Sequence, residues 1–477
     1  MRSSERTYVC AFVMKQVIFY IGFIFIIVTC ISSGVGCANI IPPEGGPKDT
    51  LPPVLLRSSP PDSTRNFRAS HITFQFDEYV NLEDVQNNLL FTPTFETNPI
   101  IEAKLRTITI RLKDSLERNT TYTFNFGDAI RDINESNVLR DFVYTFSTGN
   151  YLDSLTLNGR VLLAETGKVD TTLTVILHSS LEDSAVAKSR PRYVARVSNT
   201  GNFTFHNLPA DTFAIYVLGD AGIARRYTSK SQLFAFGNRP VITPDTSRLT
   251  LYAYREVPEQ PVVSTGTTTQ PKGEKRLLYT TNITENQQDL LKNLIFTFDR
   301  PLRFFDSSKV RFTTDSTFTP VAAYRTVLDT SKKVLAFQTT WEPDRQYHLI
   351  LAKDFAEDSL GRRLLKADTL SFTTRGQEDY GAISIRLRNL DTAQNPVLQF
   401  VQNDAVVFSV PVKTGLFNQQ AFFPGDYDLR LLYDRNGNNK WDAGQFYGAK
   451  RQPEIVRPID RKITVKPAAD NAFDITL

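Results

Sequence analysis

One segment of the chain carries oxygen side chains at the spacing of a cation-binding loop. It runs from Asp434 to Asp442 and reads Asp-Arg-Asn-Gly-Asn-Asn-Lys-Trp-Asp. A tight loop turns alternate side chains inward, so oxygens from several positions can converge on one hard cation, for which calcium is the natural guess. The candidate calcium ligands are Asp434, Asn436, Asn438, Lys440 and Asp442.

This segment departs from the EF-hand pattern at two positions. Asn439 stands where that loop has glycine, and Gln445 stands where it has a bidentate glutamate. With only two formal negative charges, any calcium affinity should be weak, roughly 0.1 to 1 mM. The alternative is an Asn/Gly hairpin loop whose side chains bond their own backbone, and both interpretations stay open. The matching segment after Asp220 lacks oxygen ligands at the next two alternate positions, so any metal binds once.

The sequence predicts no catalytic residues, and we expect a protein that is not an enzyme. The histidines lie in different parts of the chain and mostly within strand patterns, where a structural role is the common one. No Gly-x-Ser-x-Gly, His-Glu-x-x-His or Gly-x-x-x-x-Gly-Lys motif occurs. Two acidic groups could serve a glycosidase as paired carboxylates, but solvated loop charge is the favoured interpretation. The residues considered are His71, His178, His206, His348, Asp128, Asp132, Glu135, Asp354, Glu357 and Asp358.

Cys37 is the last cysteine of the chain, and it follows a run of apolar or near-apolar residues from Val17 to Ile31. A membrane-spanning helix needs roughly 20 apolar residues, whereas a signal-peptide core needs roughly 7 to 15. The run therefore predicts a lipoprotein signal peptide over residues 1–36, with Met14 as an alternative start, and lipid attachment at Cys37. Cys30 is the rival acceptor, and an uncleaved N-terminal anchor is the alternative.

Charge beyond residue 36 is nearly balanced. The first 36 residues hold three of the 55 basic and one of the 51 acidic residues, which leaves 52 against 50. This balance gives no electrostatic case for nucleic acid or for an anionic membrane surface. We expect no nucleic-acid partner.

Apolar residues alternate with polar ones at period two in several segments, which is typical of half-buried antiparallel strands. Two patterns also recur more than two hundred residues apart, which indicates duplicated domains in the order A-B-A-B. The sequence therefore predicts an all-β chain of tandem β-sandwich domains. The repeats are Phe74-Gln75-Phe76-Asp77 with Phe296-Thr297-Phe298-Asp299, and Gly201-Asn202-Phe203 with Gly415-Leu416-Phe417.

The first A module opens with Ser59-Pro60-Pro61-Asp62, continues with His71 to Val80 and closes with Tyr144-Thr145-Phe146-Ser147-Thr148. In these motifs it resembles the bacterial Ig-like domain of the S-layer-protein (SbsA) type. The lead-in from Gly45 to Pro53, directly after Cys37, is similar to lipoproteins of the Bacteroidota that carry this domain. The resemblance implies a surface or envelope module without catalytic residues.

The B modules carry a Gly-x-Phe strand end followed by a Pro-containing turn, and the second copy adds Asp426-Tyr427-Asp428-Leu429. They resemble prealbumin-like or carboxypeptidase-regulatory-like β-sandwiches, which host many unrelated roles. The predicted units are a Pro/Gly-rich tether over 37–53, an Ig-like domain over 54–149, a prealbumin-like sandwich over 153–255, a linker over 256–275, a second Ig-like domain over 276–375 and a second prealbumin-like sandwich over 380–477.

These observations favour a non-enzymatic envelope lipoprotein, anchored in the outer membrane and facing the periplasm or the cell surface. Its sandwiches would act as a spacer or as a binding scaffold for a protein or glycan partner. The alternatives are an accessory glycan-active enzyme and a structural component of a secretion or motility assembly. The sequence names no cofactor beyond the weak Ca²⁺ hypothesis at the Asp434 loop.

Overall fold

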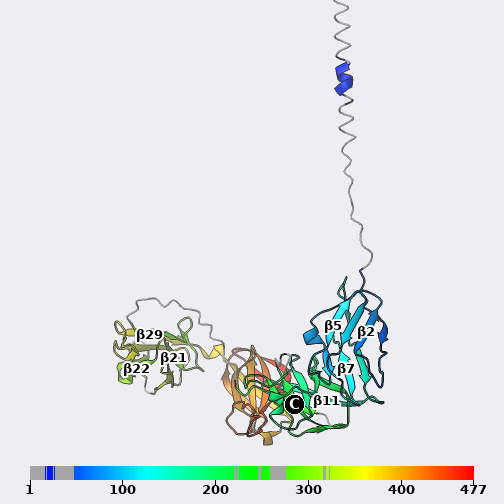
Figure 1. Cartoon of the computed structure of the whole chain (residues 1–477). Helices are drawn as coiled ribbons and strands as arrows, with labels where there is room; N and C mark the ends of the chain where they lie inside the picture. Colours follow the sequence, from blue (N-terminus) through cyan, green and yellow to red (C-terminus); the bar gives the residue numbers. More distant parts are fainter. Residues whose placement is uncertain are drawn as a thin grey trace, which may run out of the picture.

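The computed structural model describes residues 48–219, 222, 225–244, 249–257, 276–314, 318–321 and 323–477, with residues 17, 19–24 and 26, which are helical. Within these ranges, no helix is both long enough and apolar enough to cross a membrane. From residue 48 onward the described chain is almost entirely β-structure and forms four β-sandwiches in tandem (Figure 1). The predicted fold class is therefore confirmed, while the exact domain boundaries stay a prediction.

The first sandwich packs two sheets, in the orders β1-β2-β6-β5 and β10-β7-β4, with a small third sheet β3-β8-β9. Alternation determines which residues form the core: Ile72, Phe74 and Phe76 in β2 are fully buried, while His71 before them and Gln75 between the two phenylalanines are exposed. The elements are β1 (Leu55–Ser59), β2 (His71–Phe76), β3 (Val80–Leu82), α2 (Val85–Asn88), β4 (Leu90–Thr92), β5 (Ile100–Lys104), β6 (Thr107–Arg111), β7 (Thr121–Asn125), β8 (Ile130–Asp132), β9 (Val138–Leu139) and β10 (Val143–Ser147).

The second sandwich packs sheet β14-β11-β18 against sheet β13-β12-β15-β16, with β17 pairing to the other end of β15. Its β18 runs parallel to β11, whereas the other pairs are antiparallel. The elements are β11 (Leu155–Leu163), β12 (Thr174–His178), α3 (Ala185–Lys188), β13 (Tyr193–Arg196), β14 (Asn202–Leu208), β15 (Thr212–Leu218), β16 (Phe234–Phe236), β17 (Val241–Ile242) and β18 (Leu249–Ala253).

The third sandwich repeats the plan of the first, with sheets β19-β21-β26-β25 and β20-β29-β27-β23-β24 and the pair β22-β28. Its elements are β19 (Tyr279–Thr281), β20 (Gln287–Gln288), β21 (Leu294–Phe298), β22 (Leu302–Phe305), η1 (Ser307–Lys309), β23 (Val310–Thr314), β24 (Thr319–Pro320), β25 (Arg325–Leu328), β26 (Val334–Gln338), β27 (Gln346–Leu351), β28 (Ala356–Asp358) and β29 (Asp368–Thr374), followed by η2 (Gln377–Asp379).

The fourth sandwich repeats the plan of the second, with sheets β33-β30-β36 and β32-β31-β34-β35 and with β36 again parallel to the central strand β30. The two kinds of sandwich thus alternate along the chain. The elements are β30 (Gly381–Arg388), η3 (Thr392–Gln394), β31 (Pro396–Gln402), β32 (Ala405–Pro411), β33 (Leu416–Phe422), β34 (Gly425–Tyr433), β35 (Ile455–Val465) and β36 (Asp470–Thr476).

Order in space differs from order in the sequence. The second and fourth sandwiches lie side by side, and the third stands apart from the first (Figure 1). The first contacts the second through a hydrogen bond from Thr94 N to Arg192 O (2.9 Å) and through the Arg192–Glu117 ion pair (2.7 Å). The third contacts the fourth where Leu290 N donates to the Tyr380 hydroxyl (2.9 Å). The second sandwich is therefore in contact with both the first and the fourth.

Candidate binding cleft between the second and fourth sandwiches

The second sandwich carries apolar side chains on both faces of one sheet. In β15, Phe213, Ile215 and Val217 point into its own core, while Ala214, Tyr216 and Leu218 belong to a separate buried cluster on the outer face. Exposure of these apolar side chains to water would be unfavourable, so another part of the structure is expected to pack on this outer face.

A loop of the fourth sandwich covers this outer face. It links β34 to β35 and brings Phe446 against three aromatic rings of the second sandwich. The centroid distances are 5.0 Å to Phe234, 5.1 Å to Phe236 and 5.7 Å to Tyr216. Phe446 is 2% exposed, so it is the apolar anchor of this interface.

Polar contacts fix the orientation of the two sandwiches. The Phe446 N–H donates to Glu256 Oε1 (2.9 Å), and Gln452 Nε2 donates to the Phe236 carbonyl (3.0 Å). The Val456 N–H donates to the Ala164 carbonyl (2.9 Å), which ties the edge of β35 to the end of β11. Directed bonds of this kind select one orientation where apolar burial alone does not.

The Asp434 loop forms the beginning of the same β34–β35 connection. Asp434 is 1% exposed, and its carboxylate accepts from the N–H groups of Asn436 (3.1 Å), Gly437 (2.7 Å) and Asn439 (2.6 Å). A carboxylate in this position replaces water as the partner of the turn's backbone.

The other predicted ligands bond within the loop as well. The side-chain amides of Asn436 and Asn438 donate to Asp442 Oδ2 (2.6 and 2.8 Å), and Asn438 Oδ1 accepts from the Lys440 N–H (2.7 Å). Glu454 closes the loop by accepting from the N–H groups of Arg435 and Asp442, and burial raises the pKa of its carboxyl group. Among the described residues no group of three or more His, Cys, Asp or Glu side chains is arranged to hold a metal. Calcium at this loop stays a prediction.

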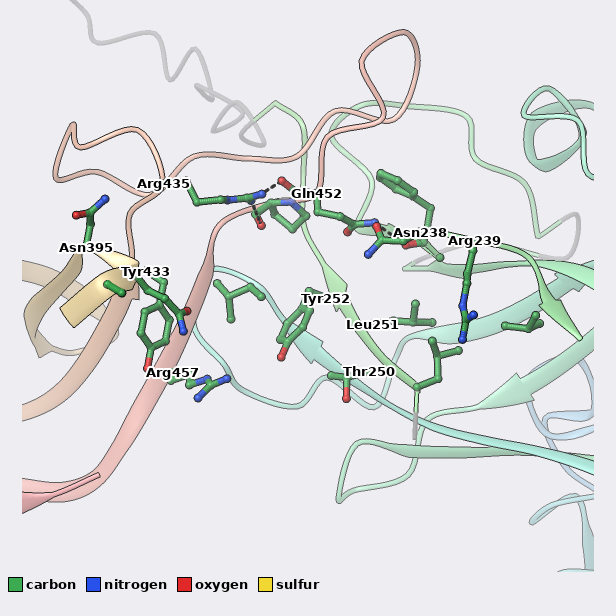
Figure 2. Close-up of a pocket in the computed structure, with 18 residues that line it drawn as sticks. Asn238, Arg239, Thr250, Leu251, Tyr252, Asn395, Tyr433, Arg435, Gln452 and Arg457 are labelled. Atoms are coloured by element: carbon green, nitrogen blue, oxygen red, sulfur yellow. Dashed lines mark hydrogen bonds between the residues drawn. The ribbon is translucent and has the colours of Figure 1, made fainter. Parts of the chain in front are cut away.

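A cleft opens beside the interface, with a volume of about 930 Å³. Figure 2 shows Tyr252 between Arg239 on one side and Tyr433 with Arg457 on the other, with Arg435 and Gln452 across the opening. The lining residues come from both sandwiches: Phe236, Gly237, Asn238, Arg239, Val241, Leu249, Thr250, Leu251 and Tyr252, with Ala393, Gln394, Asn395, Tyr433, Arg435, Gln452, Pro453, Ile455 and Arg457.

The charged groups of this lining are all of one sign. Among its described residues it contains three arginines and no carboxylate. Arg435 is held by hydrogen bonds to the carbonyls of Gln452 and Pro453, and the Arg457 guanidinium lies 5.2 Å from the centre of the Tyr433 ring. Half-buried tyrosines, side-chain amides and guanidinium groups together suit an anionic ligand with some apolar surface.

The remaining predicted site residues lie elsewhere. Cys37, the rival Cys30 and Asp220 fall outside the described residues. His178 is buried, and desolvation lowers the pKa of its imidazole to about 4, whereas His348 pairs with Ser371 Oγ (2.8 Å).

Two of the acidic loop residues, Asp132 and Glu357, are engaged by the backbone or by arginine. Asp132 accepts from the N–H groups of Glu135, Ser136 and Asn137, and Glu357 pairs with Arg303 and Arg363. Glu357 is 4% exposed and Asp132 is 2% exposed, so these carboxylates are buried and not solvated loop charge.

Sequence reasoning did not predict the cleft or the interface beside it. Two signals were present: the unbroken apolar run Phe213 to Leu218, and the aromatic residues Trp441 and Phe446 in an otherwise polar connection. Trp441 lies at this interface and donates to the Glu454 carbonyl (2.9 Å), and Trp341 is in the core of the third sandwich. Neither tryptophan forms an open platform for a sugar.

One part of the chain matches a known protein family. Residues 49–148 match the family of bacterial Ig-like domains. The Ig-like resemblance of the first sandwich is thereby confirmed. The match covers the first sandwich alone, so the prealbumin-like identity of the second and fourth sandwiches and the Bacteroidota lipoprotein type stay predictions.

Solved structures give distant likenesses. The TIE protein of Bacillus anthracis is 12% identical, with 91% of this chain and 76% of that chain covered and a TM-score of 0.16. The major pilin BcpA of Bacillus cereus is 10% identical, with 67% and 99% covered and a TM-score of 0.16. The S-layer protein rSbsC is 10% identical, with 85% and 67% covered and a TM-score of 0.15. At such scores these likenesses carry no argument about function. Among curated proteins, none matches the chain.

Proposed function

We propose that this protein is a non-enzymatic envelope lipoprotein, held at the outer membrane through a lipid on Cys37, whose sandwiches form a binding scaffold. The observation that carries the proposal is the direct packing of the fourth sandwich on the second, which shapes a cleft of about 930 Å³ from two separate domains. A chain that served only as a spacer would need no such interface, because tandem domains can be joined by linkers alone.

Two further observations support a binding role over a catalytic one. Residues 49–148 match a bacterial Ig-like domain, and sandwiches of the Ig type present loops at their ends that can serve as binding surfaces. Of the carboxylates considered for catalysis, Asp132 and Asp358 accept from backbone N–H groups, and Glu357 pairs with Arg303 and Arg363. A general acid or base must instead reach the substrate with its proton-carrying atom.

Fractionation of cells that express the full chain tests the anchor. The Cys37→Ser variant is expected in the soluble fraction or as unprocessed precursor, without incorporation of a labelled fatty acid. Cys30→Ser is the matched control and should leave both labelling and membrane attachment unchanged. Membrane attachment that survives Cys37→Ser contradicts the proposal.

A further inference from the structure

We propose that the cleft binds an extended acidic peptide segment of a partner protein, which adds as a strand to the open edge of β18. This inference deepens the proposed function as a binding scaffold and rests on it. Strand addition to a free sheet edge is a common mode of peptide recognition, in which main-chain hydrogen bonds supply affinity and side-chain contacts supply specificity.

The direction of the main-chain groups in β18 follows from its hydrogen bonds. The Ala164 N–H donates to the Ala253 carbonyl, so Ala253 faces β11. Tyr254 exchanges two hydrogen bonds with Phe234 on the opposite side (2.9 Å each). Because main-chain groups alternate along a strand, the N–H and C=O groups of Thr250 and Tyr252 point the same way as those of Tyr254, away from β11.

This edge is open because β16 diverges from β18 after one bridge. Phe236 pairs with Tyr216 of β15, and its carbonyl accepts from Gln452 Nε2, so β16 does not continue along β18. In the described part of the chain, no strand pairs with β18 beyond that bridge except β11. Four consecutive residues, Leu249 to Tyr252, line the cleft as a result.

Natural proteins cover or charge such edges, since a free edge invites pairing with another chain. Here the edge lines a cleft between two sandwiches. The outward N–H and C=O groups of Thr250 and Tyr252 repeat at the spacing of an extended main chain. A peptide strand matches this spacing with its own backbone, and for this reason a peptide is favoured.

The positive charge of the lining favours a peptide with acidic side chains. Arg435 and Arg457 stand beside the edge strand, and no carboxylate pairs with either of them among the described residues of the lining. An extended strand places every second side chain on one face, roughly 7 Å apart. Acidic residues on the face toward Tyr433 can therefore meet the Arg457 guanidinium, which lies over that ring. The ring of Tyr252 offers apolar surface to the rest of the peptide.

The test measures binding of a fluorescent probe peptide, four repeats of Glu-Val, to the full chain purified in detergent. We expect saturable binding that weakens as ionic strength rises. Four repeats of Lys-Val should bind at least about tenfold more weakly, because their charges oppose those of the arginines. A Glu-Val probe with N-methylated amides should also lose about tenfold, because it cannot complete the ladder.

Two variants of the protein examine the edge and the charge separately. Thr250→Pro removes an outward-facing N–H at an edge strand, where proline is tolerated, and should reduce probe binding at least about tenfold. Arg457→Glu should do the same by reversing one charge. Lys462→Glu, an exposed site further along β35, is the matched control and should bind the probe as the parent does.

A probe dissociation constant above about 1 mM overturns the proposal. It is also overturned if Arg457→Glu binds as the parent does, or if the N-methylated probe binds as tightly as the unmodified one. Binding of soluble polygalacturonate in place of the peptide would reassign the cleft to an acidic glycan. None of these outcomes affects the fractionation of Cys37→Ser. The proposal of a lipid anchor and the proposal of a peptide ligand can therefore be refuted independently.

Discussion

The ring of Phe446, from the fourth sandwich, packs at 60° and 5.0 Å against the ring of Phe234, from the second. These two residues join domains that are separated in the sequence by the whole third sandwich. Their contact is the centre of the interface beside the cleft, and it makes the arrangement of the domains open to direct test.

Phe446→Ala should separate the second and fourth sandwiches. Truncation of a buried aromatic anchor costs roughly 2 to 4 kcal/mol, which is a large part of the stability of a domain interface. Small-angle scattering should show a larger radius of gyration. Phe304→Ala, at a phenylalanine that is 51% exposed, is the matched control, and an equal radius in the two variants would refute the role of Phe446.

Gly167→Ala should disturb the same interface by steric overlap. Gly167 has a φ of +68°, and a Cβ there would lie 2.3 Å from Pro458 Cδ and 2.8 Å from the Val456 carbonyl oxygen. Gly437→Ala is the control, since Gly437 has a φ of +76° with no atom within 4 Å of an added Cβ. Both variants carry the left-handed strain of about 1 to 2 kcal/mol, and only Gly167→Ala adds an overlap. Equal losses in melting temperature would mean that the close approach is absent in solution.

The Asp434 loop allows a test of calcium against hydrogen bonding. A site with a dissociation constant of roughly 0.1 to 1 mM should gain about 1 to 2 kcal/mol of stability at about 5 mM calcium. The resulting rise in melting temperature should vanish in Asp442→Asn. If calcium leaves the melting temperature of the parent chain unchanged, the loop is held by hydrogen bonds alone.

Asp434→Ala should destabilise the fourth sandwich even in the presence of a chelator. It leaves three N–H groups, those of Asn436, Gly437 and Asn439, without their acceptor. Each unmatched group costs about 1 to 3 kcal/mol where water cannot replace the carboxylate. Thermal unfolding in EDTA measures the loss, and Asp442→Ala, whose carboxylate accepts only from side-chain amides, should lose less.

His178 should make the stability of the second sandwich depend on pH. Its folded-state pKa is about 4, below the ordinary value of 6.5, because burial disfavours the charged imidazole. The unfolded chain therefore binds the proton more readily, and stability falls as the pH drops from about 6.5 to about 4, by about 3 kcal/mol in all. His178→Phe should flatten this part of the profile in urea unfolding, and the exposed His71→Phe should not. A parent profile that is level between pH 6.5 and 4 would contradict the burial of a neutral His178.

Much of each sandwich could be predicted from the spacing of apolar residues. Phe74 and Phe76 in β2 are fully buried, and Phe296 and Phe298, their repeats in β21, are at most 2% exposed. Alternation identifies the face that a strand turns to its own core, and it does so for each domain separately.

The association of domains could not be read in the same way. Phe213 to Leu218 break the alternation, which indicates that both faces of β15 are covered, but apolar burial has no direction and does not name the covering surface. The Asp434 loop is ambiguous for another reason, because oxygens at alternate positions suit a cation and backbone N–H groups equally well. The cleft depends on two domains at once, so no local pattern could predict it.

The direct packing of the second sandwich on the fourth also determines how the molecule responds to tension. A pull between the first and the fourth sandwich is transmitted through the second sandwich and its contacts with the fourth, among them Val456–Ala164, and this path bypasses the third sandwich. If that interface parts first, the third sandwich and the chain on either side of it are released as hidden length, since an extended chain supplies roughly 3.3 to 3.6 Å per residue. The protein can then lengthen before any of its β-sandwiches unfolds.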